Sequence, residues 1–454
     1  MSTNQTVPLQ GWTASPNGRG TIDILSSSVI TLFLCSWSVL CLNVFPPSFS
    51  DPKKAWRKFI MAGICLLGPE FIFQLAVGQW SAARRSIADF KRSKYKGWTM
   101  THAFFANMGG FAVDIQWSPN GERTTFPLDA KQVLYLVEHG YIKYGEVCID
   151  KELIKDKDKV DGVVRGLIVC QILWYSVTVI ARFSQHLDVT VLELATIGFI
   201  LCSSGTYYFW FHKPMDVGRA IILHPTATLE EIRFEGGDCS GEHYRRTPMD
   251  FVERVEWSWT RYWAHWKGLV RKLTGINFDR TVRPMDKIPD DNFPLITGRP
   301  LWVLCFFQVS YGAVHLTGWS LPFPTCTERL LWHIATVTIM VCILVTWAVE
   351  VWGWRITSTL ESSLEKEDIE DSANRPRWHP KARLRRFFAK MRNTTEPLDP
   401  VMDVPLRALI PVTSAAAIYS FARAYVIVGG FVNLRALPPS AYESINWTAF
   451  LPHF

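Results

Sequence analysis

The sequence lacks the short motifs that mark common soluble enzymes. It contains no GxSxG nucleophile elbow, P-loop, GxGxxG after a strand, HExxH or series of histidine boxes. It also has no zinc-finger spacing, RNA-binding signature or isolated basic helix, so its formal net charge of +7 does not indicate nucleic-acid binding. The charge instead fits the excess of Lys and Arg that membrane proteins carry on their cytoplasmic side.

Cysteine pairs are missing as well. The chain has 10 cysteines but no CxxC pair, and most of them fall within apolar runs, where cysteine acts as a small hydrophobic residue. This spacing argues against structural zinc and against a disulfide framework. We expect no metal and no cofactor.

Long apolar runs dominate what is present. Of the 454 residues, 48% are hydrophobic and 13% aromatic. Several runs approach or pass about 18 residues almost without charge, the length that a membrane-crossing helix needs. We therefore expect an all-α fold, a polytopic membrane helical bundle with about six full spans. These are residues 24–45, two spans within 164–211, two within 300–351, and 405–433.

Residues 59–78 are a further apolar stretch that either turns back or forms a kinked seventh span. They carry Gly68-Pro69 at their centre, and Lys or Arg residues flank them on both sides. If they crossed the membrane, two neighbouring basic connections would lie on opposite faces, against the positive-inside rule. A re-entrant hairpin keeps both connections on the cytoplasmic face. Its turn must then be buried against the other helices, because backbone groups at membrane depth need partners.

Charge in the connections sets the expected orientation. Residues 79–163 are expected to form a cytoplasmic helical segment, and residues 352–404 a charged cytoplasmic loop. Residues 212–299 should carry an interfacial helix whose tryptophans lie at headgroup level, and the HKPMDV motif that precedes it should place His212 and Lys213 among the headgroups.

The two ends of the chain contain few Lys or Arg residues. The N-terminal segment 1–23 and the tail 434–454 are therefore expected on the non-cytoplasmic side. Asn4 and Asn446, each in an Asn-x-Thr triplet, are the expected glycosylation sites there. Asn393 stands in a similar triplet but would lie inside and stay bare.

Glu70 is the first candidate for chemistry. An ionisable side chain within hydrocarbon costs at least about 2 to 3 kcal/mol, so such residues often mark function. Glu70 could act as a general acid, a proton relay or a ligand anchor. The structural alternatives are that it caps the helix after the turn by accepting backbone N–H groups, or that it pairs with a buried arginine.

Three further side chains within apolar runs are candidate binding residues. Arg423 needs a carboxylate, backbone carbonyls or a polar cavity, and Glu70 or Glu193 could be its partner. Either a structural ion pair or a substrate clamp would satisfy it. His315 and His333 lie in consecutive spans, but no third ligand accompanies them, so hydrogen bonds between helices are favoured over a metal site.

Four stretches carry a resemblance to known sequences. They are LLGPEF, WTMTHAFFANMGGF, FWFHKPMDV and ARAYVIVGGFVNLR. In this order they resemble a large family of uncharacterised filamentous-fungal multi-pass membrane proteins, over nearly the whole chain. The resemblance implies a fungal membrane protein of an endomembrane or the plasma membrane, and it transfers no catalytic residue.

Three classes of function fit these observations. A non-catalytic scaffold or membrane-organising role ranks first, because the charged loops are long and catalytic motifs are absent. A membrane-embedded enzyme acting on a lipophilic substrate is the second, for example a terpenoid cyclase with Glu70 as proton donor and tryptophans lining its pocket. A transporter or receptor-like protein is the third, although no inverted repeat is evident. The expected partners are the lipid bilayer and a lipophilic small molecule, not nucleic acid.

Overall fold

The protein is mostly helical in the computed structural model, which describes residues 9–15, 18–118, 121–155, 162–237, 244, 246–252, 256–275, 283–350, 391–395 and 399–450. The α-helices within these ranges are α1 Thr21–Trp37, α2 Asp51–Leu67, α3 Pro69–Arg92, α4 Met100–Asn107, α5 Ala130–Glu138, α6 Tyr144–Val147, α7 Lys151–Lys155, α8 Gly162–Ser184, α9 Val191–Phe209, α10 Leu229–Glu235, α11 Ser258–Thr274, α12 Arg299–Thr317, α13 Cys326–Ala348 and α16 Leu406–Asn433. The strands are β1 Phe111–Gln116, β2 Arg123–Leu128 and β3 Ile221–Leu223, and the short 3-10 helices are η1 Gly318–Ser320, η3 Pro400–Met402, η4 Pro439–Tyr442 and η5 Trp447–Phe450.

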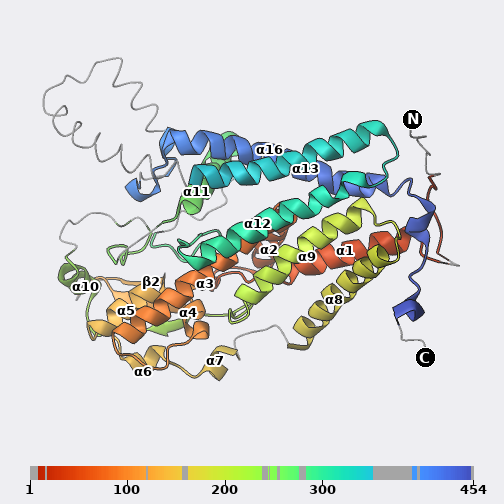
Figure 1. The fold of residues 1–454 in the computed structure, drawn as a ribbon. Helices are drawn as coiled ribbons and strands as arrows, with labels where there is room; N and C mark the ends of the chain where they lie inside the picture. Colours follow the sequence, from red (N-terminus) through yellow and green to blue (C-terminus); the bar gives the residue numbers. More distant parts are fainter. Residues whose placement is uncertain are drawn as a thin grey trace, which may run out of the picture.

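Long apolar helices form a bundle around α9 (Figure 1). In the most apolar part of α9, 72% of the positions are buried, against 28% to 33% in α8, α12, α13 and α16. Glycines let neighbours approach α9 closely, since a Cβ at Gly198 would meet the His315 ring at 3.0 Å and one at Gly205 would meet Phe73 at 2.6 Å. The other helices therefore turn much of their apolar surface outward.

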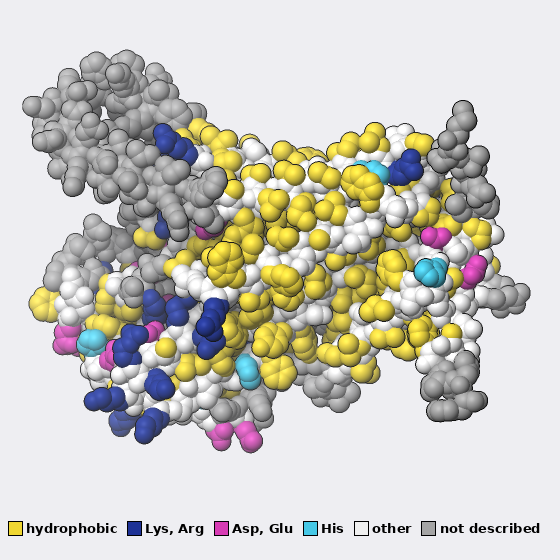
Figure 2. Space-filling view, in the orientation of Figure 1, with side chains coloured by type: hydrophobic (Ala, Val, Ile, Leu, Met, Phe, Trp, Pro, Cys, Tyr) yellow, Lys and Arg dark blue, Asp and Glu magenta, His cyan; other side chains and the backbone are white. Residues whose placement is uncertain are grey.

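That outward surface forms a belt of hydrophobic side chains over the face of the bundle that Figure 2 shows. Trp302 is 75% exposed, Phe306 68% and Phe421 80%. A contiguous apolar surface of this extent is not stable in water and marks contact with a membrane. Together with five helices long and apolar enough to cross a bilayer, the belt indicates a membrane protein.

Helices α2 and α3 meet at a sharp break. The two helices are long and apolar enough to cross a bilayer only when taken together, and the pair bends by 111° at Gly68. Pro69 disfavours helical conformation in the residue before it and suits the first position of a new helix, so the chain stops at Gly68 and starts again at once. The break lies inside the protein, because Gly68, Pro69 and Glu70 are all buried.

A globular layer covers one end of the bundle (Figure 1). It consists of the C-terminal half of α3, helices α4 to α7, α10 and a three-stranded sheet of order β2-β1-β3. Strand β1 pairs antiparallel with β2, with Phe111 opposite Leu128, and parallel with β3, with Phe111 opposite Ile221. The all-helical expectation for residues 79–163 is therefore wrong at β1 and β2. Gly109, with φ of +81°, turns the chain from α4 into β1.

The first expected span is also shorter than its apolar run. Helix α1 ends at Trp37, and residues 38–50 are not helical. The chain leaves the helix because Asn43 donates to the backbone carbonyls of Ile288 and Pro289, while the Val44 N–H donates to the Met108 carbonyl. This run therefore ends against the globular layer instead of continuing as a helix.

The tryptophans at the start of α11 and along it pack against the rest of the protein. Trp257 and Trp259 are each 7% exposed. Phe71 of α3 packs edge-on against Trp259 and Trp263, and Trp266 donates to the Thr413 hydroxyl of α16 at 3.0 Å. These side chains dock α11 against the bundle, and its interfacial placement stays a prediction.

The segments near both ends of the chain lie together at the end of the bundle away from the globular layer (Figure 1). Gln10 pairs with Leu437, and the Tyr442 hydroxyl donates to the Gly11 carbonyl at 2.9 Å. Buried Arg182 of α8 donates to the carbonyls of Ser440, Ala441 and Glu443. These contacts fix the tail beside the N-terminal segment.

Candidate functional site

Glu70 lies in the first turn of α3, in the interior of the bundle. Its side chain is 2% exposed. The Tyr419 hydroxyl and the Glu70 backbone N–H lie close to the carboxyl group, but neither makes a well-aligned hydrogen bond with it, and no other described residue does so. The helix N-terminus next to it favours negative charge. The expected capping role is not observed, because no side-chain cap occurs at this end of α3.

Arg423 of α16 is bound by a histidine and not by a carboxylate. Its Nη1 donates to His315 Nε2 at 2.8 Å, and its Cζ lies 5.3 Å from the centre of the Tyr311 ring. The His315 Nδ1 lies 2.9 Å from the Tyr311 carbonyl oxygen. The imidazole is therefore neutral, with its proton on Nδ1 and its Nε2 accepting from the guanidinium.

Tyr419 stands one helical turn before Arg423 and lies beside Glu70. Its ring packs edge-on against Phe71 at 6.0 Å. Its hydroxyl lies close to the Glu70 carboxyl group and the Tyr311 hydroxyl, although neither contact is a well-aligned hydrogen bond in the described part of the chain. Glu70, Tyr311, His315, Tyr419 and Arg423 thus form one group of buried polar side chains, each at most 5% exposed. We call this group the polar centre.

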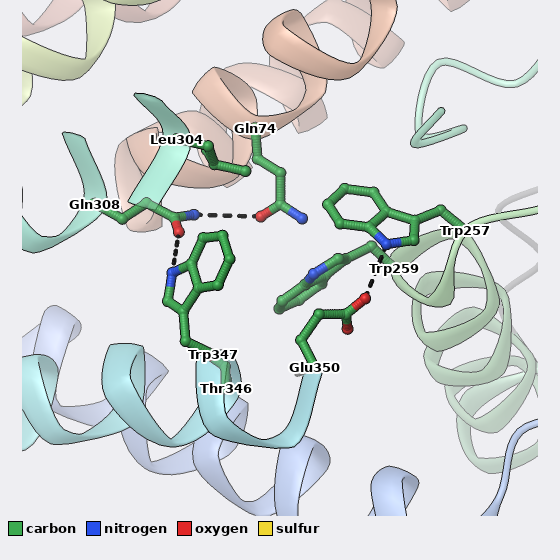
Figure 3. A pocket seen from close by; sticks show the side chains of 8 residues that line it. All are labelled: Gln74, Trp257, Trp259, Leu304, Gln308, Thr346, Trp347 and Glu350. Carbon is green, nitrogen blue, oxygen red and sulfur yellow. Dashed lines mark hydrogen bonds between the residues drawn. The ribbon is translucent and has the colours of Figure 1, made fainter. Parts of the chain in front are cut away.

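A pocket adjoins the polar centre one turn further along α3. It measures about 250 Å³, part of which is open to solvent, and is lined by Gln74, Trp257, Trp259, Leu304, Gln308, Thr346, Trp347 and Glu350. We call it the tryptophan pocket (Figure 3). Gln308 Nε2 donates to Gln74 Oε1 at 3.3 Å, and Trp347 Nε1 donates to Gln308 Oε1 at 2.7 Å.

Glu350 closes the opposite side of the tryptophan pocket. Its Oε1 accepts from Trp257 Nε1 at 2.8 Å and from the Ser258 hydroxyl at 2.6 Å. Burial raises the pKa of Glu350, and these two donors and the charge of Arg261 offset part of that rise. The pocket therefore places a carboxyl group among indole rings.

The structure separates the two expected histidines. His315 binds Arg423, whereas His333 stacks on Trp319 with ring centres 3.9 Å apart and contacts the Trp319 carbonyl through Nε2. In the described ranges no three His, Cys, Asp or Glu side chains come close enough to hold a metal ion. The two histidines therefore bind different partners and do not face each other.

Glu193 is not the partner of Arg423. It forms an ion pair with Arg19 and accepts hydrogen bonds from Thr190, so it fixes the start of α9 to the N-terminal segment. Arg423 and Glu70 share the polar centre without a direct ion pair between them in the described residues. The interpretation of a simple Glu70–Arg423 salt bridge is therefore replaced by a wider polar group.

The structure describes the surroundings of two of the three Asn-x-Thr triplets. Asn4 lies outside the described residues. Asn446 lies in the exposed tail, where its Oδ1 accepts from the Thr448 N–H and hydroxyl. Asn393 is only 5% exposed and donates to the Asp399 carbonyl.

Lys213 corrects another expectation. It does not reach outward but is 2% exposed, and its Nζ donates to the Cys41 carbonyl at 2.6 Å and to Gln79 Oε1 at 2.8 Å. Burial lowers its pKa to about 8. The sequence offered no signal for this contact, because its acceptors come from two distant segments.

Fold and site together define a helical membrane protein with a buried polar centre. The chain belongs to a family of unknown function, DUF8562, whose model matches residues 1–232 and 299–454. Glu70, Arg423 and Glu350 lie within the matched parts, whereas Trp257 and Trp259 do not. Neither the curated proteins nor the solved structures include a match to this chain.

Proposed function

We propose that the protein is a non-catalytic multi-pass membrane protein that organises other components at one face of a bilayer through its globular layer. The observation that carries this proposal is the path of α3. This helix of 24 residues begins at the polar centre and ends in the globular layer, where it contacts α4 and α5. A rigid helix of this kind ties the position of the layer to the interior of the bundle.

The proposal includes a topology of six spans formed by α1, α8, α9, α12, α13 and α16, with α2 and α3 as a re-entrant hairpin. The segment that leads into α2 is tied to the globular layer by the Val44 N–H, which donates to the Met108 carbonyl, and α3 ends in the same layer. Lys58, midway along α2, lies 3.5 Å from Asp216, which follows α9. Both ends of the pair thus reach the same side of the bundle. The layer would face the cytoplasm and both termini the opposite side, in an endomembrane or the plasma membrane of a filamentous fungus.

Glycosylation at Asn446 tests this topology. If the tail lies on the non-cytoplasmic face, the protein made in a fungal host should lose apparent mass on treatment with an N-glycosidase. Asn446→Gln should remove most of that shift, and Asn393→Gln should leave it unchanged. A shift that depends on Asn393 alone would reverse the orientation.

Replacement of the gene tests the function itself. In cells that lack the protein, a Glu70→Gln variant at normal abundance should restore the lipid profile and growth as fully as the unchanged chain does. Substitutions on the exposed face of the globular layer, such as Lys91→Glu with Arg92→Glu, should fail to do so. Restoration by the layer variants but not by Glu70→Gln would contradict the proposal.

That contrary outcome would favour a membrane-embedded enzyme acting on a lipophilic substrate. The observation behind this second candidate is the carboxyl group of Glu70, which has no hydrogen-bond partner among the described residues and lies one turn from the tryptophan pocket. A buried acid beside an aromatic-lined pocket could donate a proton to a double bond. Accumulation of one lipophilic compound in the Glu70→Gln strain would identify the substrate.

A further inference from the structure

The tryptophan pocket gathers side chains from four separate elements around one space. Gln74 comes from α3, Gln308 from α12, Trp347 and Glu350 from α13 and its end, and Trp259 from α11 (Figure 3). The indole rings and the carboxyl group face the same space. The volume of about 250 Å³ includes space open to solvent, so the enclosed part takes at most one small group, such as the end of a headgroup or metabolite, and not a whole lipid.

The hydrogen bonds decide what the pocket presents to an occupant. The indole N–H groups of Trp257 and Trp347 are already used by Glu350 and Gln308, so these side chains offer ring surface and not a donor. Glu350 accepts both of its hydrogen bonds through Oε1, and its Oε2 accepts none from the described residues. Ring surface together with a carboxylate oxygen that accepts nothing from the described residues is complementary to an organic cation.

Gln74 sets a second requirement for an occupant of the pocket, which is a hydrogen-bond acceptor. Its Oε1 accepts from Gln308, but its Nε2 has no partner in the described part of the chain, although the residue is only 1% exposed. Figure 3 shows this amide nitrogen directed into the space beside Trp257 and Trp259. A buried N–H donor without a partner is unfavourable, so an occupant with an acceptor oxygen would complete it.

We infer that the tryptophan pocket binds an organic ammonium ion that carries an oxygen atom a few bonds away, as in a choline-like amino alcohol or its phosphate ester. The cationic group would lie against the indole rings and beside Glu350 Oε2, and the oxygen would accept from Gln74 Nε2. This inference concerns a ligand site and stands whether or not the globular layer organises other components.

One neighbouring charge opposes a cation in the pocket. The guanidinium of Arg261 acts on Glu350, but it is directed at the backbone carbonyls of Asp403 and Glu256, at 3.4 Å and 3.3 Å. These contacts engage two of its N–H groups with the backbone, so its charge on Glu350 is shared with those carbonyls.

Calorimetric titration of the full chain in phosphatidylglycerol nanodiscs tests the inference. Choline and glycerophosphocholine are the probes, and 3,3-dimethyl-1-butanol is the neutral control of the same shape as choline. We expect saturable binding of at least one cationic probe and binding at least about tenfold weaker for the neutral control. Equal binding of choline and the neutral control, or no saturable binding of either cationic probe, would overturn the inference.

Variants locate the binding. Glu350→Gln and Trp347→Leu should each weaken it about tenfold or more, whereas Trp347→Phe, which keeps an aromatic face, should retain most of it. Trp302→Leu is the matched control, because Trp302 is 75% exposed on α12 and away from the pocket lining. An equal loss in Trp302→Leu, at equal thermal stability, would also contradict the inference.

The lipid composition distinguishes the two sources of this chemistry. If the natural occupant is a lipid headgroup, phosphatidylcholine nanodiscs should compete and weaken the apparent affinity for the free probe severalfold. If it is a free metabolite, the affinity should be the same in both kinds of nanodisc. Both results support the cation site, and each assigns its source.

Discussion

The two halves of α3 lie in different surroundings. In the globular layer, Ser86 accepts from Trp98 Nε1 at 3.0 Å, and Phe90 stacks on the same indole with ring centres 4.0 Å apart. In the bundle, Glu70 and Gln74 keep polar atoms without partners among the described residues, although both side chains are almost fully buried. Folding explains the first set of contacts. The second set costs stability, and Gln74 belongs to the ligand site that we infer at the tryptophan pocket.

The largest effect is expected at the polar centre. Arg423→Met removes the only cation of this group and leaves the Glu70 carboxyl group in the interior without a neighbouring positive charge, which should lower the free energy of unfolding by about 3 kcal/mol or more. Adding Glu70→Gln should recover about 1 to 3 kcal/mol of this loss. Thermal unfolding in nanodiscs, with the four members of the cycle compared, measures the coupling.

If the two substitutions change the free energy of unfolding additively, Glu70 and Arg423 do not interact. The polar centre would then not act as one unit, and the contrast between the halves of α3 would rest on Gln74 alone. A Tyr208→Phe variant serves as a control, because Tyr208 is 73% exposed and should leave stability within about 0.5 kcal/mol of the unchanged chain.

The next effect is expected at Lys213, whose Nζ donates to Gln79 Oε1 where the two halves of α3 meet. Its pKa is lowered from 10.5 to about 8 by burial, which corresponds to about 3 kcal/mol. Between these two pH values the unfolded chain binds more protons than the folded one, so stability should rise with pH across this window. Below the folded pKa the whole penalty is present.

Lys213→Met should abolish that rise. The measurement is the thermal unfolding midpoint from pH 7 to pH 11, with the exposed Lys91→Met as a control that keeps the pH profile unchanged. The charges of Asp290 and Lys287 also act on Lys213, and both residues are unchanged in the two variants. The rise in stability should therefore be kept in Lys91→Met and lost in Lys213→Met. A flat profile in the unchanged chain would mean that water reaches the Lys213 ammonium group.

A smaller effect is expected at Gly78, midway along α3. A Cβ there would lie 2.9 Å from the carbonyl oxygen of Pro294, so Gly78→Ala should cost about 1 to 3 kcal/mol. Gly63 of α2 is the matched control, because a Cβ there meets nothing within 4 Å. Gly63→Ala should be neutral or stabilising by up to about 1 kcal/mol, since alanine favours the helix. Equal midpoints for the two variants would show that residues 292–296 do not pack closely on α3.

Local chemistry could be predicted from the sequence, and contacts between distant segments could not. The break at Gly68 follows from Gly-Pro, and the apolar lengths of α8, α9, α12, α13 and α16 follow from composition. The sheet escaped prediction because β3 has three residues and pairs with β1 across more than a hundred positions of the chain. Its strands have no strong local signal of their own.

The candidate site shows the same division. Glu70, His315 and Arg423 stand out as polar residues in apolar runs, and the structure brings all three to one place. The tryptophan pocket could not be found in this way, because its lining comes from four elements and Glu350 lies at the end of a long apolar run. Its signals, Gln74 and Gln308 within apolar stretches, become meaningful only when α3 and α12 are seen side by side.

The smallest effect is expected in the globular layer. Asp129 caps α5 by accepting from the N–H groups of Lys131 and Gln132, and the Gln132 side chain accepts from the Asp129 N–H in return. Asp129→Ala should lower stability by about 1 kcal/mol, measured by thermal unfolding, with the exposed Lys143→Ala as the control. Choline affinity should not change in either variant, because the cap is a local contact of the layer. A weakened affinity in Asp129→Ala alone would mean that α3 transmits changes between its two halves, and the layer and the tryptophan pocket would then have to be understood as one coupled device.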